Sequence, residues 1–102
     1  MPGFHLTPHA LDDIDEISIY LQQEASDTIA LRMRAKFFEH FDALAMHPGI
    51  GHRRRDLTSR PLRFFTVDPY LIAYREAEAR IIILAVLHGA RDVKRLLRSR
   101  SE

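Results

Sequence analysis

The chain has 102 residues and a formal net charge of +1, and its hydrophobic fraction of 46% and charged fraction of 28% predict one folded, soluble domain over residues 1–102. The absence of cysteine excludes a disulfide framework, a thiolate nucleophile and a cysteine zinc site, and it fits the reducing cytoplasm, where we expect the protein to reside. No segment approaches the ~20 apolar residues of a membrane helix, and the first residues lack the basic start and apolar run of a signal peptide, so we expect no membrane association.

Residues 4–7 have the pattern of a short strand, and residues 8–23 have that of a helix. Thr7 offers a capping side chain at the start of this helix, and Pro8 suits its first position. Four acidic residues follow near the N-terminus of the helix, where the helix dipole favours negative charge. We interpret them as a solvated face rather than a metal site: Asp12, Asp13, Asp15 and Glu16.

A second helix is predicted over residues 27–46, because Ser26 can cap it and His47-Pro48-Gly49 ends it. The two helices should form an antiparallel hairpin whose apolar stripe faces a sheet. The residues predicted to make this contact are Ile14, Ile17, Leu21, Met33, Phe37, Phe41 and Leu44.

The second helix also carries a second apolar stripe, about 100° round its axis from the first. Leu31, Phe38 and Ala45 form this stripe, and Ile19 is an apolar residue on the acidic face of the first helix. A helix with one solvent-exposed side needs only one apolar stripe, so the additional apolar residues either pack on further elements of the domain or bind a partner. We predict that at least one of these patches docks an amphipathic helix of a partner protein.

Three strand-length segments rich in β-branched and aromatic residues follow, at residues 62–67, 70–75 and 80–88. The last of these is apolar on both faces, so it should lie in the middle of the sheet and be covered on both sides. Residues 92–98 can form a short basic helix with Val93, Leu96 and Leu97 facing the body of the domain, and residues 99–102 are interpreted as a loose end. The predicted fold class is α+β, in the order β-α-α-β-β-β-(α), with the helical hairpin packed on one face of a small antiparallel sheet.

The sequence contains none of the common nucleotide, nucleophile or zinc motifs. It has no P-loop, no GxSxG elbow and no HExxH pair, and its single GxG, Gly49-Ile50-Gly51, reads as a plain turn after a helix. We therefore predict no metal site and no cofactor.

Charge is distributed unevenly along the chain. Residues 1–51 hold three basic and eight acidic residues, a net charge of −5, whereas residues 52–102 hold twelve basic and six acidic residues, a net charge of +6. This polarity either creates two differently charged surfaces or is neutralised within the domain. Most of the basic residues are Arg, which suits bidentate contacts to phosphate and carboxylate groups. We predict a functional basic surface that meets nucleic acid or an acidic protein segment.

Five short motifs follow one another along nearly the whole chain. They are LTPHALDDI at residues 6–14, ALAMHPGIG at 43–51, LR at 62–63, YLIAYR at 70–75 and VLHGARD at 86–92. Together they resemble the ParE-type toxins of the RelE/ParE toxin–antitoxin superfamily, which includes plasmid stabilisation proteins. The resemblance implies a RelE/ParE-like fold and a cognate, ParD-like antitoxin that neutralises the toxin. It further implies one of two toxic mechanisms, poisoning of DNA gyrase by ParE-type members or cleavage of ribosome-bound messenger RNA by RelE-type members.

The residues favour the first mechanism. In a RelE-type ribonuclease the catalytic candidates would be Arg63, Arg80 and His88, but no tyrosine or histidine follows Arg91, which leaves His88 and Tyr74 as the candidates for acid or base. We therefore predict a gyrase poison without catalytic residues of its own. The alternatives are a ribosome-dependent mRNA endoribonuclease and a non-toxic relative that only binds antitoxin. The resemblance places toxicity near the chain end, and the predicted target-binding basic surface comprises Arg91, Lys94, Arg95, Arg98 and Arg63.

Overall fold

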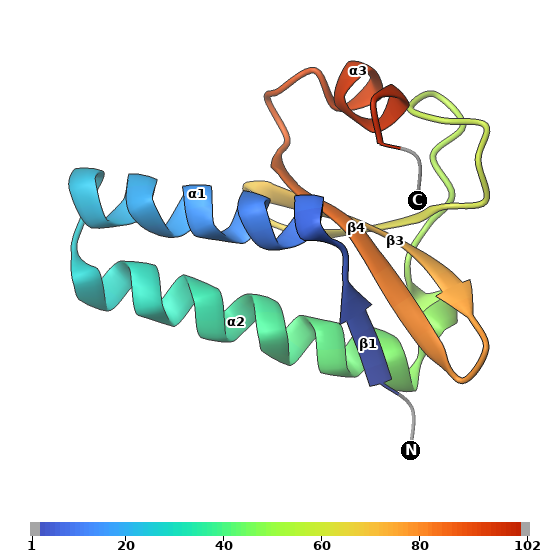
Figure 1. Cartoon of the computed structure of the whole chain (residues 1–102), viewed down its shortest axis with the longest axis horizontal. Coiled ribbons are helices and arrows are strands. Elements are labelled where there is room, and N and C mark those ends of the chain that lie inside the picture. Colours follow the sequence, from blue (N-terminus) through green and yellow to red (C-terminus); the bar gives the residue numbers. More distant parts are fainter. Residues whose placement is uncertain (1–2, 101–102) are drawn as a thin grey trace.

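A computed structural model of the chain describes residues 3–100 and contains three α-helices, a short 3₁₀ helix and four strands in this part (Figure 1). None of the helices in this part is both long enough and apolar enough to cross a membrane. The elements follow in the order β1 (Gly3–Leu6), α1 (Pro8–Glu24), α2 (Asp27–Met46), η1 (Pro48–Ile50), β2 (Arg63–Val67), β3 (Tyr70–Ala77), β4 (Arg80–His88) and α3 (Val93–Arg98).

Side-chain caps start both long helices where the sequence predicts them. The Oγ1 of Thr7 accepts a hydrogen bond from the Ala10 N–H at 3.1 Å, and the Oγ of Ser26 accepts one from the Ile29 N–H at 3.1 Å. Each cap satisfies one of the N–H groups that the first turn of a helix leaves without a partner. Helix α2 ends before the 3₁₀ turn η1, so the interpretation of the glycine motif as a turn is confirmed.

The four strands form one mixed sheet in the order β1-β4-β3-β2. Strands β2, β3 and β4 pair antiparallel, whereas β1 runs parallel to β4, with Phe4 opposite Ile81 and Leu6 opposite Ile83. The α+β class and the element order are confirmed, but the prediction of an antiparallel sheet is wrong at β1. The chain reaches β4 from β1 only after the helical hairpin and two further strands, so no hairpin turn imposes an antiparallel direction on this pair.

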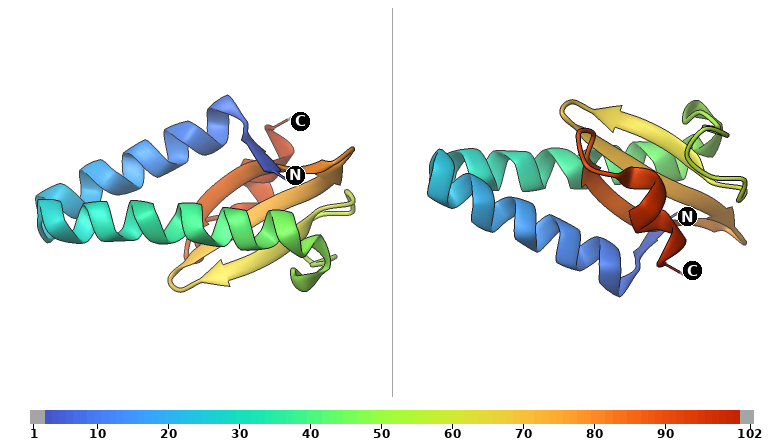
Figure 2. Two further views of the ribbon diagram at one scale, coloured as in Figure 1. Left: turned by 90° about the horizontal axis from the view of Figure 1, so that it is seen from below. Right: turned by 90° about the horizontal axis from the view of Figure 1, so that it is seen from above.

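Both faces of the central strand β4 are covered, as predicted from its apolar sequence. On one face, α1 and α2 pack over the sheet through residues such as Phe37 and Phe41. On the other face, α3 and residues 51–62 form a second apolar cluster that includes Leu62 and Leu97. The two views of Figure 2 show the resulting three layers, with α2 in front from below and α3 in front from above. The seven predicted hairpin contacts are all buried or half-buried: Ile14, Ile17, Leu21, Met33, Phe37, Phe41 and Leu44.

Candidate functional site

The C-terminal segment, residues 89–100, leaves β4 through a short connection that fixes its direction. The Gly89 N–H donates a hydrogen bond to the carbonyl oxygen of Pro69 at 2.9 Å. Asp92 then caps α3, because its Oδ1 accepts the Arg95 N–H at 3.1 Å. The side of α3 that packs on the sheet is the predicted apolar one: Val93, Leu96 and Leu97.

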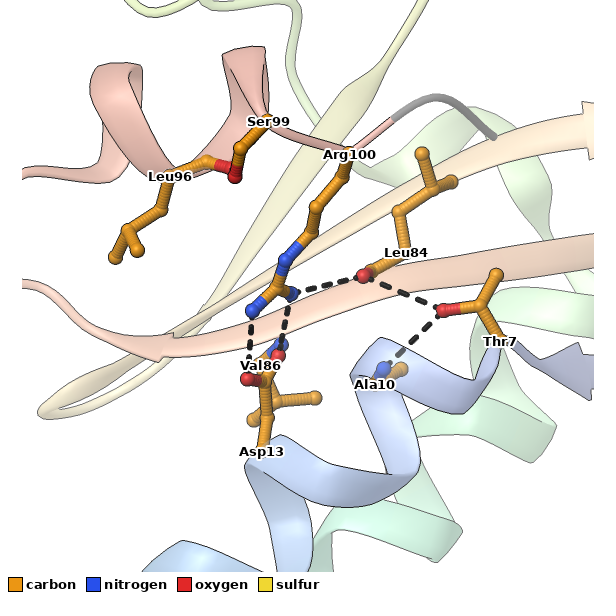
Figure 3. Close-up of polar contacts among 8 residues, drawn as sticks. All are labelled: Thr7, Ala10, Asp13, Leu84, Val86, Leu96, Ser99 and Arg100. Carbon is orange, nitrogen blue, oxygen red and sulfur yellow. Dashed lines mark hydrogen bonds and ion pairs between the residues drawn. The ribbon is translucent and has the colours of Figure 1, made fainter.

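A buried ion pair anchors the end of this segment to α1 (Figure 3). The Nη1 of Arg100 donates to Oδ2 of Asp13 at 2.6 Å and its Nη2 donates to Oδ1 at 2.8 Å, and the two residues are only 9% and 5% exposed. Arg100 also donates to the carbonyl oxygen of Leu84 at 3.1 Å, and Asp13 accepts the Val86 N–H at 3.0 Å. The bidentate geometry is the strong form of an arginine–carboxylate contact.

The ion pair also completes the hydrogen bonding of β4. Strand β1 pairs with β4 only as far as Ile83, so the next backbone groups on that side have no strand partner. The carbonyl of Leu84 instead accepts from Arg100 and, at 3.5 Å, from the Thr7 hydroxyl, and the N–H of Val86 donates to Asp13. A buried backbone group without a partner costs about 1–3 kcal/mol, so this arrangement favours keeping both charged side chains in place.

The sequence-based reading missed this anchor. The sequence predicts Asp13 to be one of the solvated acids of α1 and Arg100 to be part of a loose end, and both predictions are wrong. Residues 101–102 of the predicted loose end lie outside the described part. For Asp13 a signal existed, because it lies on the same helix face as Ala10 and Ile17, which belong to the core and its border. For Arg100 no local pattern marks burial, because its partner lies 87 residues away in the sequence.

Arg60 joins the preceding loop to the C-terminal segment. Its Nη1 donates to the carbonyl oxygen of Leu97 in the last turn of α3 at 3.3 Å, and to that of Arg100, just beyond the helix, at 2.7 Å. Leu57 packs on the same apolar cluster as α3. Residues 51–62 and the C-terminal segment therefore form one layer over the sheet.

Four cations of the predicted target-binding surface lie exposed on this layer, and we call Arg91, Lys94, Arg95 and Arg98 the basic row. Within residues 3–100, no carboxylate lies at salt-bridge distance from any of the four. The fifth predicted member, Arg63, lies apart from them on β2. Its Nη1 donates to the carbonyl oxygen of Gly51 at 3.0 Å and its Nε lies 3.7 Å from Oε1 of Glu76, so it is engaged within the domain.

The three ribonuclease candidates do not come together as a catalytic group. Arg80 and His88 occupy opposite ends of the nine-residue strand β4, and at about 3.3 Å per residue those ends are about 26 Å apart. Arg63 lies between them across the sheet, opposite Tyr74 on β3. The Nδ1 of His88 accepts the Ala90 N–H at 3.0 Å, which engages one of its two ring nitrogens in the exit from the strand. General acid–base catalysis requires its groups within hydrogen-bond reach of one substrate.

The residues predicted to bind antitoxin fall into two groups. Leu31 is 68% exposed and Ile19 is 54% exposed, and they lie in the first half of α2 and the second half of α1, towards the connection between the two helices. This end of the hairpin extends beyond the sheet (Figure 1). Phe38 is half-buried, with its ring centroid 5.9 Å from that of Phe4 and 5.4 Å from that of Phe41, and Ala45 is buried in the core. The predicted stripe is thus divided, because its C-terminal half covers β1.

Comparisons with known proteins identify the family. The family model described as "ParE toxin of type II toxin-antitoxin system, parDE" matches residues 4–93, which is most of the chain. A solved chain of the chromosomal ParDE toxin–antitoxin system from P. aeruginosa superposes with a TM-score of 0.74 at 21% sequence identity, covering 86% of this chain and 96% of that one. No curated protein matches the sequence. The motifs, the fold and the family model agree, and the chain belongs to the ParE toxin family of type II toxin–antitoxin systems.

Proposed function

We propose that this toxin poisons DNA gyrase in the cytoplasm and that the basic row makes the contact with its target. The observation that carries the proposal is that the row is exposed on a segment anchored at its far end by the Asp13–Arg100 pair. The backbone of this segment is already ordered before binding, so binding costs mainly the conformational entropy of the exposed cationic side chains. Membership of the ParE toxin family and the separation of Arg80 from His88 both favour this mechanism over RNA cleavage.

A toxin of this kind needs no catalytic residue, because the DNA-cleaving chemistry belongs to gyrase. Gyrase alternates between states in which its DNA is cleaved and resealed. A protein that binds the cleaved state more tightly than the resealed state shifts the population towards broken DNA by its differential affinity. The toxin therefore has to supply a binding surface of defined shape and charge, which is what the basic row offers.

We further propose that a ParD-like antitoxin docks an amphipathic helix on the exposed end of the hairpin, around Ile19 and Leu31. Changing both residues to Lys should weaken antitoxin binding without unfolding the toxin, because both side chains are mostly in solvent. The matched control changes Met46 and Ile50 to Lys; these exposed apolar residues lie at the opposite end of the hairpin and just beyond it. Equal antitoxin affinity of the first variant and the control, measured by calorimetry, would place the docking surface elsewhere.

Induced expression of the toxin in cells tests the proposed mechanism. Gyrase poisoning should give broken chromosomal DNA and an SOS response before protein synthesis declines. Immediate arrest of translation with cleaved messages would instead identify a ribosome-dependent ribonuclease, and normal growth would identify a non-toxic antitoxin-binding protein. Either of these two results would overturn the proposal.

A further inference from the structure

The folded chain separates its charge into two layers on opposite faces of the sheet. The hairpin, residues 8–46, holds three basic and eight acidic residues, whereas residues 51–62 and 89–100 together hold nine basic and two acidic ones. The ion pair Asp13–Arg100 joins the two layers, while Arg34–Asp15 lies within the hairpin and Arg54–Asp56 within the loop. Opposite charges therefore neutralise one another at only a few contacts. The uneven charge along the sequence becomes an acidic surface on the hairpin and a basic surface on the opposite layer.

On the positive layer, cations from two distant segments meet. Arg54 of the loop and Arg91 and Lys94 of the C-terminal segment line one cavity of about 400 Å³, which Asp56, Asp68 and Asp92 also line. The pKa of Asp56 is held below its usual value, first by its hydrogen bond from Arg54 and also by the charge of Lys94, which places the loop and α3 within electrostatic reach of each other. We call the basic row together with Arg53, Arg54 and Arg55 the outer basic surface; all seven side chains are exposed.

The composition of this surface indicates what kind of partner it fits. Protein–protein interfaces are usually centred on buried apolar and aromatic anchors, whereas binding to a nucleic-acid backbone depends on cations that neutralise phosphates. Within residues 3–100, the exposed large apolar side chains all belong to α1, α2 and η1, and none to the outer basic surface: Leu11, Ile19, Tyr20, Ile29, Leu31, Met46 and Ile50. Six of the seven cations are Arg, whose planar guanidinium binds phosphate oxygens in pairs.

We propose that the outer basic surface binds the phosphate backbone of double-stranded DNA, without reading its sequence. This inference rests on the proposed gyrase poisoning. It states that the basic row binds the DNA that gyrase holds and does not bind an acidic groove of the enzyme. The hairpin packs on the other face of the sheet, and its apolar end, which extends beyond the sheet, is left for the antitoxin. The loop cations Arg53, Arg54 and Arg55, which the family resemblance does not single out, become part of the target site.

The first test measures binding of the purified toxin to a fluorescent duplex of about 20 base pairs by anisotropy, at salt concentrations between about 50 and 200 mM. The affinity should fall steeply with salt, with a slope that lessens by about 0.9 for each phosphate-contacting cation removed. One variant changes Lys94, Arg95 and Arg98 to Gln, and a second changes Arg53 and Arg55 to Gln. Each should raise Kd at least about tenfold at 100 mM salt.

The control variant changes Arg32 and Lys36, two exposed cations of the hairpin, to Gln and should bind the duplex as the unchanged toxin does. Absence of salt-dependent binding, a loop variant with unchanged Kd, or an equal loss in the control would overturn the inference. Tighter binding to a single-stranded RNA of the same length would overturn the assignment to DNA.

A parallel gyrase cleavage assay separates the two proposals. A toxin that makes gyrase accumulate broken plasmid but does not bind the free duplex would leave gyrase poisoning intact and refute DNA binding by the outer basic surface. A toxin that binds the duplex but leaves gyrase unaffected would refute gyrase poisoning and keep the DNA-binding surface.

Discussion

Replacing Asp13 by Ala tests the anchor of the C-terminal segment. The change leaves the guanidinium of Arg100, 9% exposed, without its carboxylate, and it leaves the Val86 N–H without an acceptor. Breaking a buried ion pair by removing one partner typically costs about 3–5 kcal/mol. Because Arg100 is close to the chain end and can turn towards solvent, we expect the lower part of this range, about 3 kcal/mol. That is a large fraction of the 5–15 kcal/mol by which a small domain is usually stable.

Urea denaturation followed by circular dichroism measures this loss. The matched control is Asp15→Ala on the same helix, which breaks the exposed pair with Arg34, whose atoms are 3.0 Å apart, and should cost no more than about 1 kcal/mol. In a double-mutant cycle, Arg100→Ala should cost much less in the Asp13→Ala background than in the unchanged protein. A loss below about 1 kcal/mol for Asp13→Ala, or additive effects in the cycle, would refute the reasoning that this pair holds the segment in place.

Three further predictions follow from single residues. Phe37→Ala should reduce the free energy of unfolding by about 3–5 kcal/mol, since the ring is almost fully buried against the sheet; a much smaller loss in chemical denaturation would contradict its place in the core. Tyr74→Phe should cost about 1–3 kcal/mol, because Oη donates to the Pro48 carbonyl at 2.7 Å and accepts the Gly51 N–H at 2.9 Å. Burial raises the pKa of Tyr74 above 10.0, so the contribution of its neutral hydroxyl to stability is present below pH 10 and is lost as the pH rises through the raised value. The stability of the Phe variant should therefore decline less in this pH range. An unchanged decline would contradict this reasoning. Neither the unchanged toxin nor its His88→Ala variant should cut ribosome-bound messages. If the unchanged toxin cuts them and His88→Ala abolishes the cuts, the conclusion that His88 is not catalytic is contradicted.

Local signals in the sequence were sufficient for the helices and for the centre of the sheet. Thr7 and Ser26 cap the helices that the sequence predicts, because a cap acts within three residues. Strand β4 is recognisable as central, because a strand covered on both sides must be apolar on both faces. The apolar side of α3 was also predictable from its spacing.

Features that depend on distant contacts were not predictable in the same way. The parallel direction of β1 and β4 depends on the path of the chain through the helical hairpin and two further strands. No turn joins the two strands directly, so no turn sequence predicts their relative direction. The burial of Arg100 depends on Asp13, and the burial of Ala45 and Phe38 depends on β1 lying beneath the end of α2. The sequence also could not decide whether the uneven charge is neutralised within the domain or forms two charged surfaces. That depends on which face of the sheet each segment covers, and composition does not determine this.

The measurement that tests the central claim most directly is a cleavage assay with purified gyrase and supercoiled plasmid. The toxin should make linear DNA accumulate, and so should the hairpin control with Arg32 and Lys36 changed to Gln. The variant with Lys94, Arg95 and Arg98 changed to Gln should keep the melting profile and antitoxin affinity of the unchanged toxin but produce little linear DNA. If this variant produces as much linear DNA as the unchanged toxin, or if the unchanged toxin produces none, the basic row is not the surface through which this protein poisons gyrase.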